Sequence, residues 1–244
     1  MTRIDDFVKR MARDRRFRGR GKASSYLRFL FEDLAVGDRR VLSIEPEGWF
    51  SLYAGCRDAA AVTWLDSSPV KRDHDPQRRF ERHRDDLGLQ AVVRAMRGVF
   101  PGIPSGERFD VILIHESIHR FDERAAPRLS RNLRAIKSYK QSLRQIAQVA
   151  EDGAVLIVTG HSPYNLFPFF HLPNPFAPGV DWDAHQSPSL WASLFRQIGF
   201  EKPRISWAVP ALPGPLGRAL FGHVIGSYFY TSHFRLVLTK STAG

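Results

Sequence analysis

The segment RVLSIEPEGWFSLYAGCRDAAAVTWLD, residues 40–66, decides the fold class, because it places two apolar strands around a short helix. Residues 40–44 and 60–65 are short apolar runs, which is typical of strands that are buried on both faces. Residues 49–54 lie between them and suit a short helix. Strand, helix and strand in this order predict a parallel sheet with helices on its faces.

The same alternation continues along most of the chain. Residues 109–114, FDVILI, form the clearest strand, and residues 154–159 form another apolar strand. Further helices are predicted at 24–35, 125–150 and 188–198, and further strands at 89–94, 204–209 and 227–238. This order predicts an α/β fold that binds ligands beyond the carboxyl ends of its strands.

Length and composition fit a single domain with one core. The chain has 244 residues, of which 43% are hydrophobic. We expect a basic N-terminal arm over residues 1–22 and one domain over residues 23–244. Cys56 is the only cysteine, and the sequence has no secretory signal and no apolar run of about 18 residues. We therefore expect a cytoplasmic protein without a transmembrane segment.

The first loop, Glu45-Pro46-Glu47-Gly48-Trp49, limits which cofactor the sheet can hold. A dinucleotide fold needs several glycines here, and two carboxylates would repel a diphosphate, so NAD and FAD are poor candidates. The sequence also has no G-x-x-x-x-G-K-[ST] stretch for a nucleoside triphosphate. The carboxylates instead favour S-adenosylmethionine, which carries a sulfonium and an ammonium group and has no phosphate.

Asp66 lies at the end of the second predicted strand, 21 residues beyond Glu45. An acidic side chain at that place can accept hydrogen bonds from two ribose hydroxyls. The alternative is a surface aspartate that caps the next turn. The order of strand, loop, helix and strand favours the ribose role.

Five motifs resemble those of class I S-adenosylmethionine-dependent methyltransferases and come in the family's order. They are RRVLSIEPEGWFSLYA, VTWLDSSP, FDVILIHESIHRF, VAEDGAVLIV and HQSPSLWASLFRQIGFE. The resemblance covers residues 24–240 and implies a Rossmann-like, doubly wound, mostly parallel sheet whose last strand, SHFRLVLTK, is antiparallel. It also implies S-adenosylmethionine as cofactor, with Gly48 on a loop glycine, Asp66 on the ribose-binding acid and Glu116 on the acid of the fourth-strand motif.

The first motif departs from the family pattern at two positions. Glu45 stands at the family's first glycine, and Ser43 stands where the family has an acid. The Glu45 side chain would intrude where the methionine part of the cofactor lies, or Glu45 or Glu47 would replace the lost carboxylate.

The candidate site residues lie just after the predicted strands. Those expected to contact the cofactor are Glu45, Glu47, Gly48, Asp66, Ser67 and His115. His119 is the candidate general base, because a neutral imidazole accepts a proton near neutral pH, although an ordinary loop histidine is the alternative. No metal site is expected, since no compact spacing such as H-E-x-x-H occurs and only one cysteine is available.

Two further segments bear on the substrate. The aromatic stretch 161–187 is expected to form a lid insertion in the domain, with Tyr164, Phe167, Phe169, Phe170 and Phe176 as candidate pocket residues, unless they only pack the loop onto the domain. Residues 1–40 carry +6 of the net charge of +11, and basic residues recur every three or four positions over 128–144. The basic arm over residues 1–22 and the basic residues over 128–144 are candidate contacts for RNA or an anionic membrane surface, and a solvated segment is the alternative.

Three functions are compatible with these observations. The first is a methyltransferase that acts on an oxygen or nitrogen of a small-molecule or lipid-like acceptor. Asp66 and the histidines near the cleft support this reading, which is the one that we expect. The alternative is a non-catalytic, methyltransferase-like binding or scaffold protein that has lost the cofactor, which the altered glycine loop supports. The third is an RNA methyltransferase recruited through the basic segments.

Overall fold

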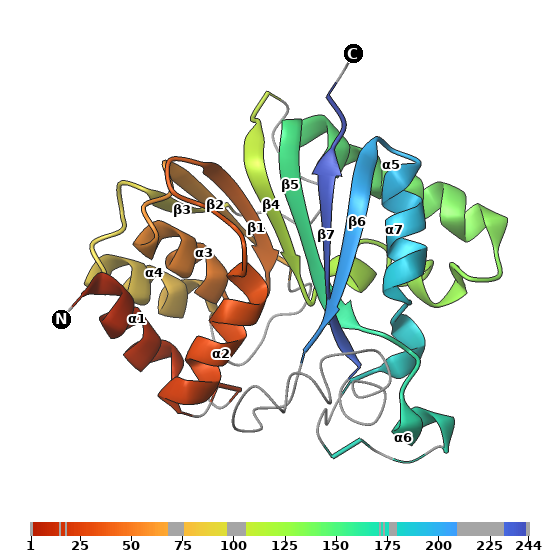
Figure 1. The fold of residues 1–244 in the computed structure, drawn as a ribbon, viewed down its shortest axis with the longest axis horizontal. Coiled ribbons are helices and arrows are strands. Elements are labelled where there is room, and N and C mark those ends of the chain that lie inside the picture. The colour runs from red at the N-terminus through yellow and green to blue at the C-terminus, as the bar shows by residue number, and fades with distance from the viewer. Residues whose placement is uncertain are drawn as a thin grey trace. The chain divides into compact units, whose positions relative to one another are not determined.

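A computed structural model describes residues 2–14, 16–17, 19–67, 76–96, 106–170, 172, 174–175, 180–208 and 232–242 (Figure 1). Its seven strands form one sheet in the order β3-β2-β1-β4-β5-β7-β6. The chain divides into two compact units. Unit 1 comprises residues 1–115 and 149–154, and unit 2 comprises residues 116–148 and 155–244.

Unit 1 contains the parallel part of the sheet. The strands are β1 (Arg40–Glu45), β2 (Ala61–Asp66), β3 (Val93–Met96) and β4 (Phe109–His115). β1 pairs in parallel with β2 and β4, and β2 pairs in parallel with β3. The helices α3 (Trp49–Cys56) and α4 (Pro76–Asp86) follow β1 and β2 in the chain, as the crossover connections of parallel strands require.

Two further helices of unit 1 precede the sheet in the chain. In α1 (Arg3–Met11), Thr2 and Asp5 form a capping box, and Phe7 and Met11 are buried. α2 (Arg20–Phe31) starts four residues before the predicted start at residue 24, after Gly19 at φ 96°. The predicted arm over residues 1–22 thus contains a helix with a buried face, and its boundary as a separate segment stays a prediction.

Unit 2 contains the antiparallel part of the sheet. β5 (Ala150–His161) enters this unit at Val155 and from there runs antiparallel to β7 (His233–Lys240). β7 runs antiparallel to β6 (Phe200–Trp207). The predicted fold class, a mostly parallel sheet with an antiparallel last strand, is therefore confirmed. Of the predicted strand 227–238, residues 227–231 lie outside the described residues.

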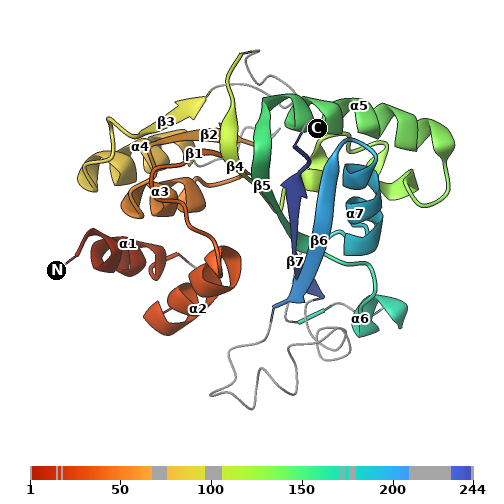
Figure 2. The same ribbon diagram turned by 45° about the horizontal axis from the view of Figure 1, so that its top comes forward.

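The helices of unit 2 are α5 (Leu133–Val149), α6 (Leu166–Phe169) and α7 (Pro188–Arg196), with the short 3₁₀ helices η1 (Ile118–Arg120), η2 (Ala126–Arg128) and η3 (Trp182–Ala184). α7 lies beside β6 and β7 (Figure 2). A ring contact of 5.3 Å between Tyr139 and Trp191 joins α5 to α7. The core of this unit therefore lies between the helices α5 and α7 and the antiparallel strands.

Three predicted boundaries were wrong by several residues. The helix predicted over 125–150 begins at Leu133, because Asn132 caps it by accepting hydrogen bonds from the backbone N–H groups of Arg134 and Ala135. That helix passes directly into β5 at Ala150, four residues before the predicted start of the strand at residue 154. The third strand is Val93–Met96 rather than 89–94.

No described helix has the length and apolar character needed to cross a membrane.

Candidate functional site

The end of β1 is occupied by the side chain of its last residue. The Glu45 carboxylate accepts hydrogen bonds from the backbone N–H groups of Phe50 (3.1 Å) and Ser51 (2.8 Å). It also accepts hydrogen bonds from the hydroxyl groups of Ser51 (2.8 Å) and Ser43 (2.7 Å). Glu45 thus caps the start of α3, where backbone N–H groups have no partner within the helix.

Burial makes this carboxylate inaccessible. Glu45 is 1% exposed. Burial raises the pKa of Glu45 above its ordinary value, and the hydrogen bonds from Phe50, Ser43 and Ser51 oppose that rise. A helix N-terminus is also a natural anion-binding position, and here an internal carboxylate fills it.

Aromatic side chains pack around the same loop. The indole N–H of Trp64 donates a hydrogen bond to the backbone carbonyl of Glu45 (2.9 Å). The Phe80 ring lies 4.2 Å from the Trp64 ring. Gly48 has φ 74°, and a Cβ atom there would lie 2.3 Å from Cδ2 of Phe80. Gly48 is therefore needed both for its backbone conformation and for the close approach of Phe80.

The second acid of the loop is paired with two arginines. Glu47 forms ion pairs with Arg16 (3.4 Å) and with Arg79, and its side chain is 11% exposed. The acids that were expected to attract a cationic cofactor therefore both interact with groups of the chain itself.

Asp66 ends β2 and lies directly beside the first loop. In the parallel register of β1 and β2, Asp66 is the partner of Glu45, so the two residues are on neighbouring strands. Asp66 and Ser67 are half-buried. This placement is compatible with the predicted ribose contact, which stays a prediction.

His115 ends β4 and packs among aromatic rings. Its ring centroid lies 4.4 Å from that of Phe50 and 5.9 Å from that of Tyr26, and the residue is 7% exposed. The expected contact between His115 and a cofactor stays a prediction.

In unit 2, His119 on η1 belongs to a group of histidines. Its ring centroid is 4.5 Å from that of His185, which in turn is 5.6 Å from that of His161. Burial, together with Arg120, lowers the pKa of His119 to about 4. The imidazole is thus neutral at neutral pH, but a base with this pKa is weaker than one matched to neutral pH.

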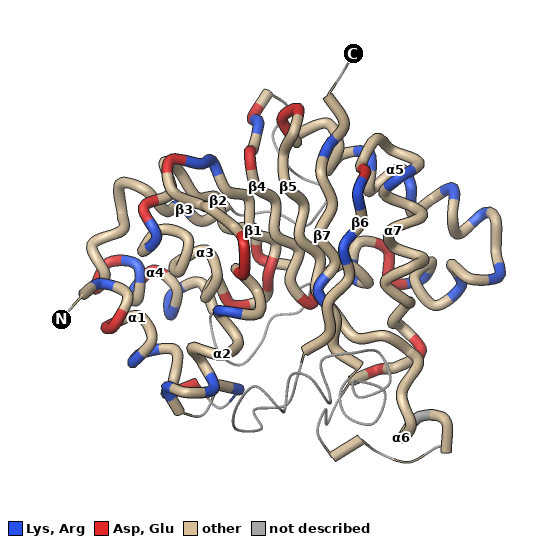
Figure 3. Tube along the Cα trace, in the orientation of Figure 1, with Lys and Arg blue, Asp and Glu red and all other residues tan. Residues whose placement is uncertain are grey.

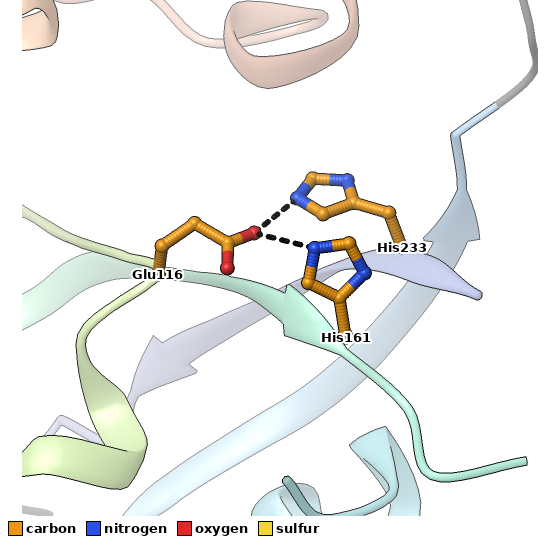
Figure 4. A group of neighbouring side chains, drawn as sticks. All are labelled: Glu116, His161 and His233. Carbon is orange, nitrogen blue, oxygen red and sulfur yellow. Dashed lines mark ion pairs between the residues drawn. The ribbon is translucent and has the colours of Figure 1, made fainter. Parts of the chain in front are cut away.

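Figure 4 shows a cluster that the sequence did not reveal, formed by Glu116, His161 and His233. Oε1 of Glu116 lies 2.7 Å from Nε2 of His233 and 3.6 Å from Nε2 of His161. The three residues are far apart in the chain, and the pairing of His161 with His233 across β5 and β7 brings two of them together. A search for compact ligand spacings could not detect such a group.

Comparison with known proteins gives a fold match and no sequence match. No protein-family model matches the chain. No curated protein matches it by sequence.

Solved structures match over most of the chain. A protein described as an S-adenosylmethionine-dependent methyltransferase from Listeria monocytogenes is 13% identical, with 90% of this chain and 100% of that chain covered and a TM-score of 0.58. The N-methyltransferase NodS from Bradyrhizobium japonicum WM9, solved with S-adenosyl-L-homocysteine, is 9% identical, with both chains fully covered and a TM-score of 0.54. This chain has the class I methyltransferase fold.

The class I methyltransferase fold does not by itself specify the reaction. The [4+2]-cyclase SpnF also matches, with 15% identity, 95% of this chain and 86% of that chain covered, and a TM-score of 0.58. The fold is therefore shared by proteins whose names state different reactions, and the function must be argued from the site.

Two segments of the methyltransferase-like domain were expected to contact substrate or partner. In the predicted lid, Tyr164, Phe169 and Phe170 are 60–71% exposed, whereas Phe176 lies outside the described residues. On and before α5, the exposed basic residues are Arg128, Arg131, Arg134, Lys137 and Arg144. Figure 3 shows several blue Lys and Arg positions along this part of the chain. Lys140 of the same stripe is half-buried and donates a hydrogen bond to Gln197 (2.8 Å). A pocket substrate, RNA or a membrane surface as partner stays a prediction.

Proposed function

We propose that this chain is a non-catalytic, methyltransferase-like binding or scaffold protein that does not use S-adenosylmethionine. The observation that carries the proposal is the Glu45 carboxylate, which is 1% exposed and bonded to Ser43, Phe50 and Ser51. It takes the position at the end of β1 at which the resemblance expects a glycine and open space for the methionine part of the cofactor.

Opening this loop would be costly. A buried donor that loses its acceptor costs about 1–3 kcal/mol, and a cofactor that needs the space of Glu45 must first take the acceptor away from several donors. The ring of Phe80 packs against Gly48, so the glycine that remains also faces its own chain rather than an open hollow. The cost of rearranging the loop would offset much of the binding free energy of a cofactor.

A second candidate is a methyltransferase acting on an oxygen or nitrogen of a small-molecule or lipid-like acceptor. Asp66 favours it, because this acid is half-buried at the end of β2 and in register with the first loop. The match to NodS, solved with S-adenosyl-L-homocysteine, supports the same candidate at the level of the fold. In this case Glu45 would move when the cofactor binds, and His119 stays the candidate base.

Calorimetric titration with S-adenosyl-L-homocysteine separates the two candidates. We expect no binding by the wild-type chain up to millimolar ligand. Binding by the wild type that is lost in Asp66→Asn, and kept in the control Asp58→Asn at an exposed acid, would reject the proposal and support the enzyme.

The variant Glu45→Gly tests the cause. It restores the family's glycine and removes the carboxylate, so weak binding that appears in Glu45→Gly and not in the wild type would identify Glu45 as the obstruction. Circular dichroism of each variant would check that it is folded.

A further inference from the structure

We propose that Glu116, His161 and His233 bind one divalent transition-metal ion, with Zn²⁺ as the representative ion. The three residues belong to unit 2, and each offers one ligand atom within 4.8 Å of the others. The site does not depend on the proposed function, because none of its residues belongs to the first loop.

The backbone holds the three residues in place. His161 and His233 are direct partners in the antiparallel pairing of β5 and β7, so their side chains leave the same end of the strand pair. The two chains stay hydrogen-bonded beyond this pair, since Ser162 N–H donates to the carbonyl of Ser232 (2.9 Å). The two histidines are therefore fixed relative to each other before any ion binds.

Backbone hydrogen bonds also hold Glu116 and His233 in place. The backbone N–H of Glu116 donates to the carbonyl of Thr159 on β5 (3.2 Å), and the carbonyl of His233 accepts from Ala208 N–H (2.8 Å). Glu116 and Ser232 adopt left-handed conformations, with φ 49° and 47°. Such conformations cost about 1–3 kcal/mol in residues other than glycine and concentrate at functional sites.

The distances suit a metal ion after a small adjustment. Ligand atoms about 2.0–2.1 Å from a tetrahedral Zn²⁺ are about 3.3 Å apart. The distance of 3.6 Å between Glu116 and His161 is close to this value, whereas that of 2.7 Å between Glu116 and His233 must lengthen by about 0.6 Å. The Glu116 side chain is 26% exposed and can rotate to make this change. The ligand atoms of the two histidines, which lie within 4.8 Å of each other, need a separation of about 3.3 Å as well.

The chemistry of the ligands selects the ion. Two imidazoles and one carboxylate suit Zn²⁺ and other late divalent ions, whereas Mg²⁺ and Ca²⁺ prefer oxygen ligands only. The side chains of His161 and His233 are 13% and 7% exposed, so the site is partly shielded from solvent. His185 and Trp182 both make ring contacts of 5.6 Å with His161 and flank the site. Three protein ligands leave at least one position for water or another ligand.

The alternative is an ordinary hydrogen-bonded pair of Glu116 and His233 that holds no ion. A pair of this kind needs only one histidine, whereas the metal site needs all three side chains. Removal of His161 therefore distinguishes the two, because it leaves the closer pair intact.

The experiment is a calorimetric titration of chelator-treated full-length chain with Zn²⁺. We expect one ion per chain, at least tenfold weaker binding in each of Glu116→Gln, His161→Gln and His233→Gln, and no binding in the double variant His161→Gln/His233→Gln. His83→Gln is the control, because it removes a histidine of unit 1 and leaves the three ligands in place.

Titration of the wild-type chain with Co²⁺ covers the case in which the variants do not fold, because cobalt bound by imidazole gives visible absorption bands. Wild-type protein that shows neither these bands nor a bound Zn²⁺ would overturn the proposal. Zn²⁺ binding that is equally strong in the double variant and in the wild type would also overturn it.

Discussion

Two glutamates near the ends of central strands have opposite environments in this protein. Glu45 is the last residue of β1 and is 1% exposed, and its carboxylate accepts hydrogen bonds from the first turn of α3. Glu116 follows β4, its side chain is 26% exposed, and its carboxylate faces His161 and His233. The same side chain is thus a structural cap in one unit and a candidate ligand in the other.

The two strands differ in the type of helix that comes after them. After β1 an α-helix starts within four residues, at Trp49, and its unbonded N–H groups need an acceptor. After β4 the first helix is the short 3₁₀ helix η1. The Glu116 backbone bonds to β5, while its side chain points to two imidazoles. A carboxylate near a strand end can therefore be assigned to a functional site only when it is known whether nearby backbone N–H groups already use it as a hydrogen-bond acceptor.

The largest expected effect compares Glu45→Ala with Glu116→Ala. Glu45→Ala leaves buried N–H and hydroxyl groups without their acceptor, so we expect the free energy of unfolding to fall by about 2–4 kcal/mol. Glu116→Ala removes the close contact to His233 and should cost about 0.5–1.5 kcal/mol. Urea denaturation followed by circular dichroism measures both, and equal losses would contradict the comparison.

The second prediction concerns the packing of Phe80 against the first loop. Gly48 and Gly88 both have positive φ, but a Cβ atom at Gly88 meets nothing within 4 Å. Gly88→Ala should therefore cost only backbone strain, about 1 kcal/mol, whereas Gly48→Ala should cost about 1–3 kcal/mol more because its methyl group overlaps Phe80. Thermal unfolding of the two variants tests this. Similar melting temperatures would show that the Phe80 side chain can move away from the added methyl group at little cost.

A third prediction uses Cys56 as a reporter of the opening of α3. Cys56 ends this helix, is 4% exposed, and burial raises the pKa of its thiol to about 12. It should react with a thiol reagent only after local opening. Glu45→Ala should speed the reaction at least tenfold, because tenfold corresponds to about 1.4 kcal/mol and the expected loss is larger. Glu116→Ala should leave the rate unchanged. An unchanged rate in both variants would mean that Glu45 does not hold the helix.

The smallest expected effect is the pH dependence of stability at Glu45. Because burial raises the pKa of this group in the folded state, its stabilising contribution is fully present below the unfolded value of 4.5 and is lost as pH rises through the folded pKa. The wild type should therefore lose stability relative to Glu45→Gln as pH rises from about 4.5. Denaturation of both proteins across this range measures the change, and the opposite slope would show that the hydrogen bonds outweigh burial.

Much of the fold was predictable because buried parallel strands appear in the sequence as continuous apolar runs. The run at 109–114 is within β4, and the run at 40–44 is within β1. The start of α5 was missed because the residues before it also have helical spacing, and only the cap at Asn132 marks the boundary. Boundaries of this kind depend on single hydrogen bonds, which periodicity does not register.

The candidate sites were less predictable, for two reasons. Ser43 and Glu45 are two residues apart on a strand and so share a face, and this spacing could have suggested their hydrogen bond. The Glu116 cluster has no such signal, because the register between β5 and β7 sets the distance between His161 and His233. That register depends on the packing of the strands and not on any local motif.

Hydrogen exchange at the amides of Phe50 and Ser51, followed by NMR, tests the central claim most directly. If the Glu45 carboxylate accepts hydrogen bonds from these N–H groups, both amides should be protected from exchange in the wild type and should exchange faster in Glu45→Gln. Their chemical shifts should not change when S-adenosyl-L-homocysteine is added. Amides that exchange freely in the wild type, or that shift when this ligand is added at submillimolar concentration, would contradict the claim.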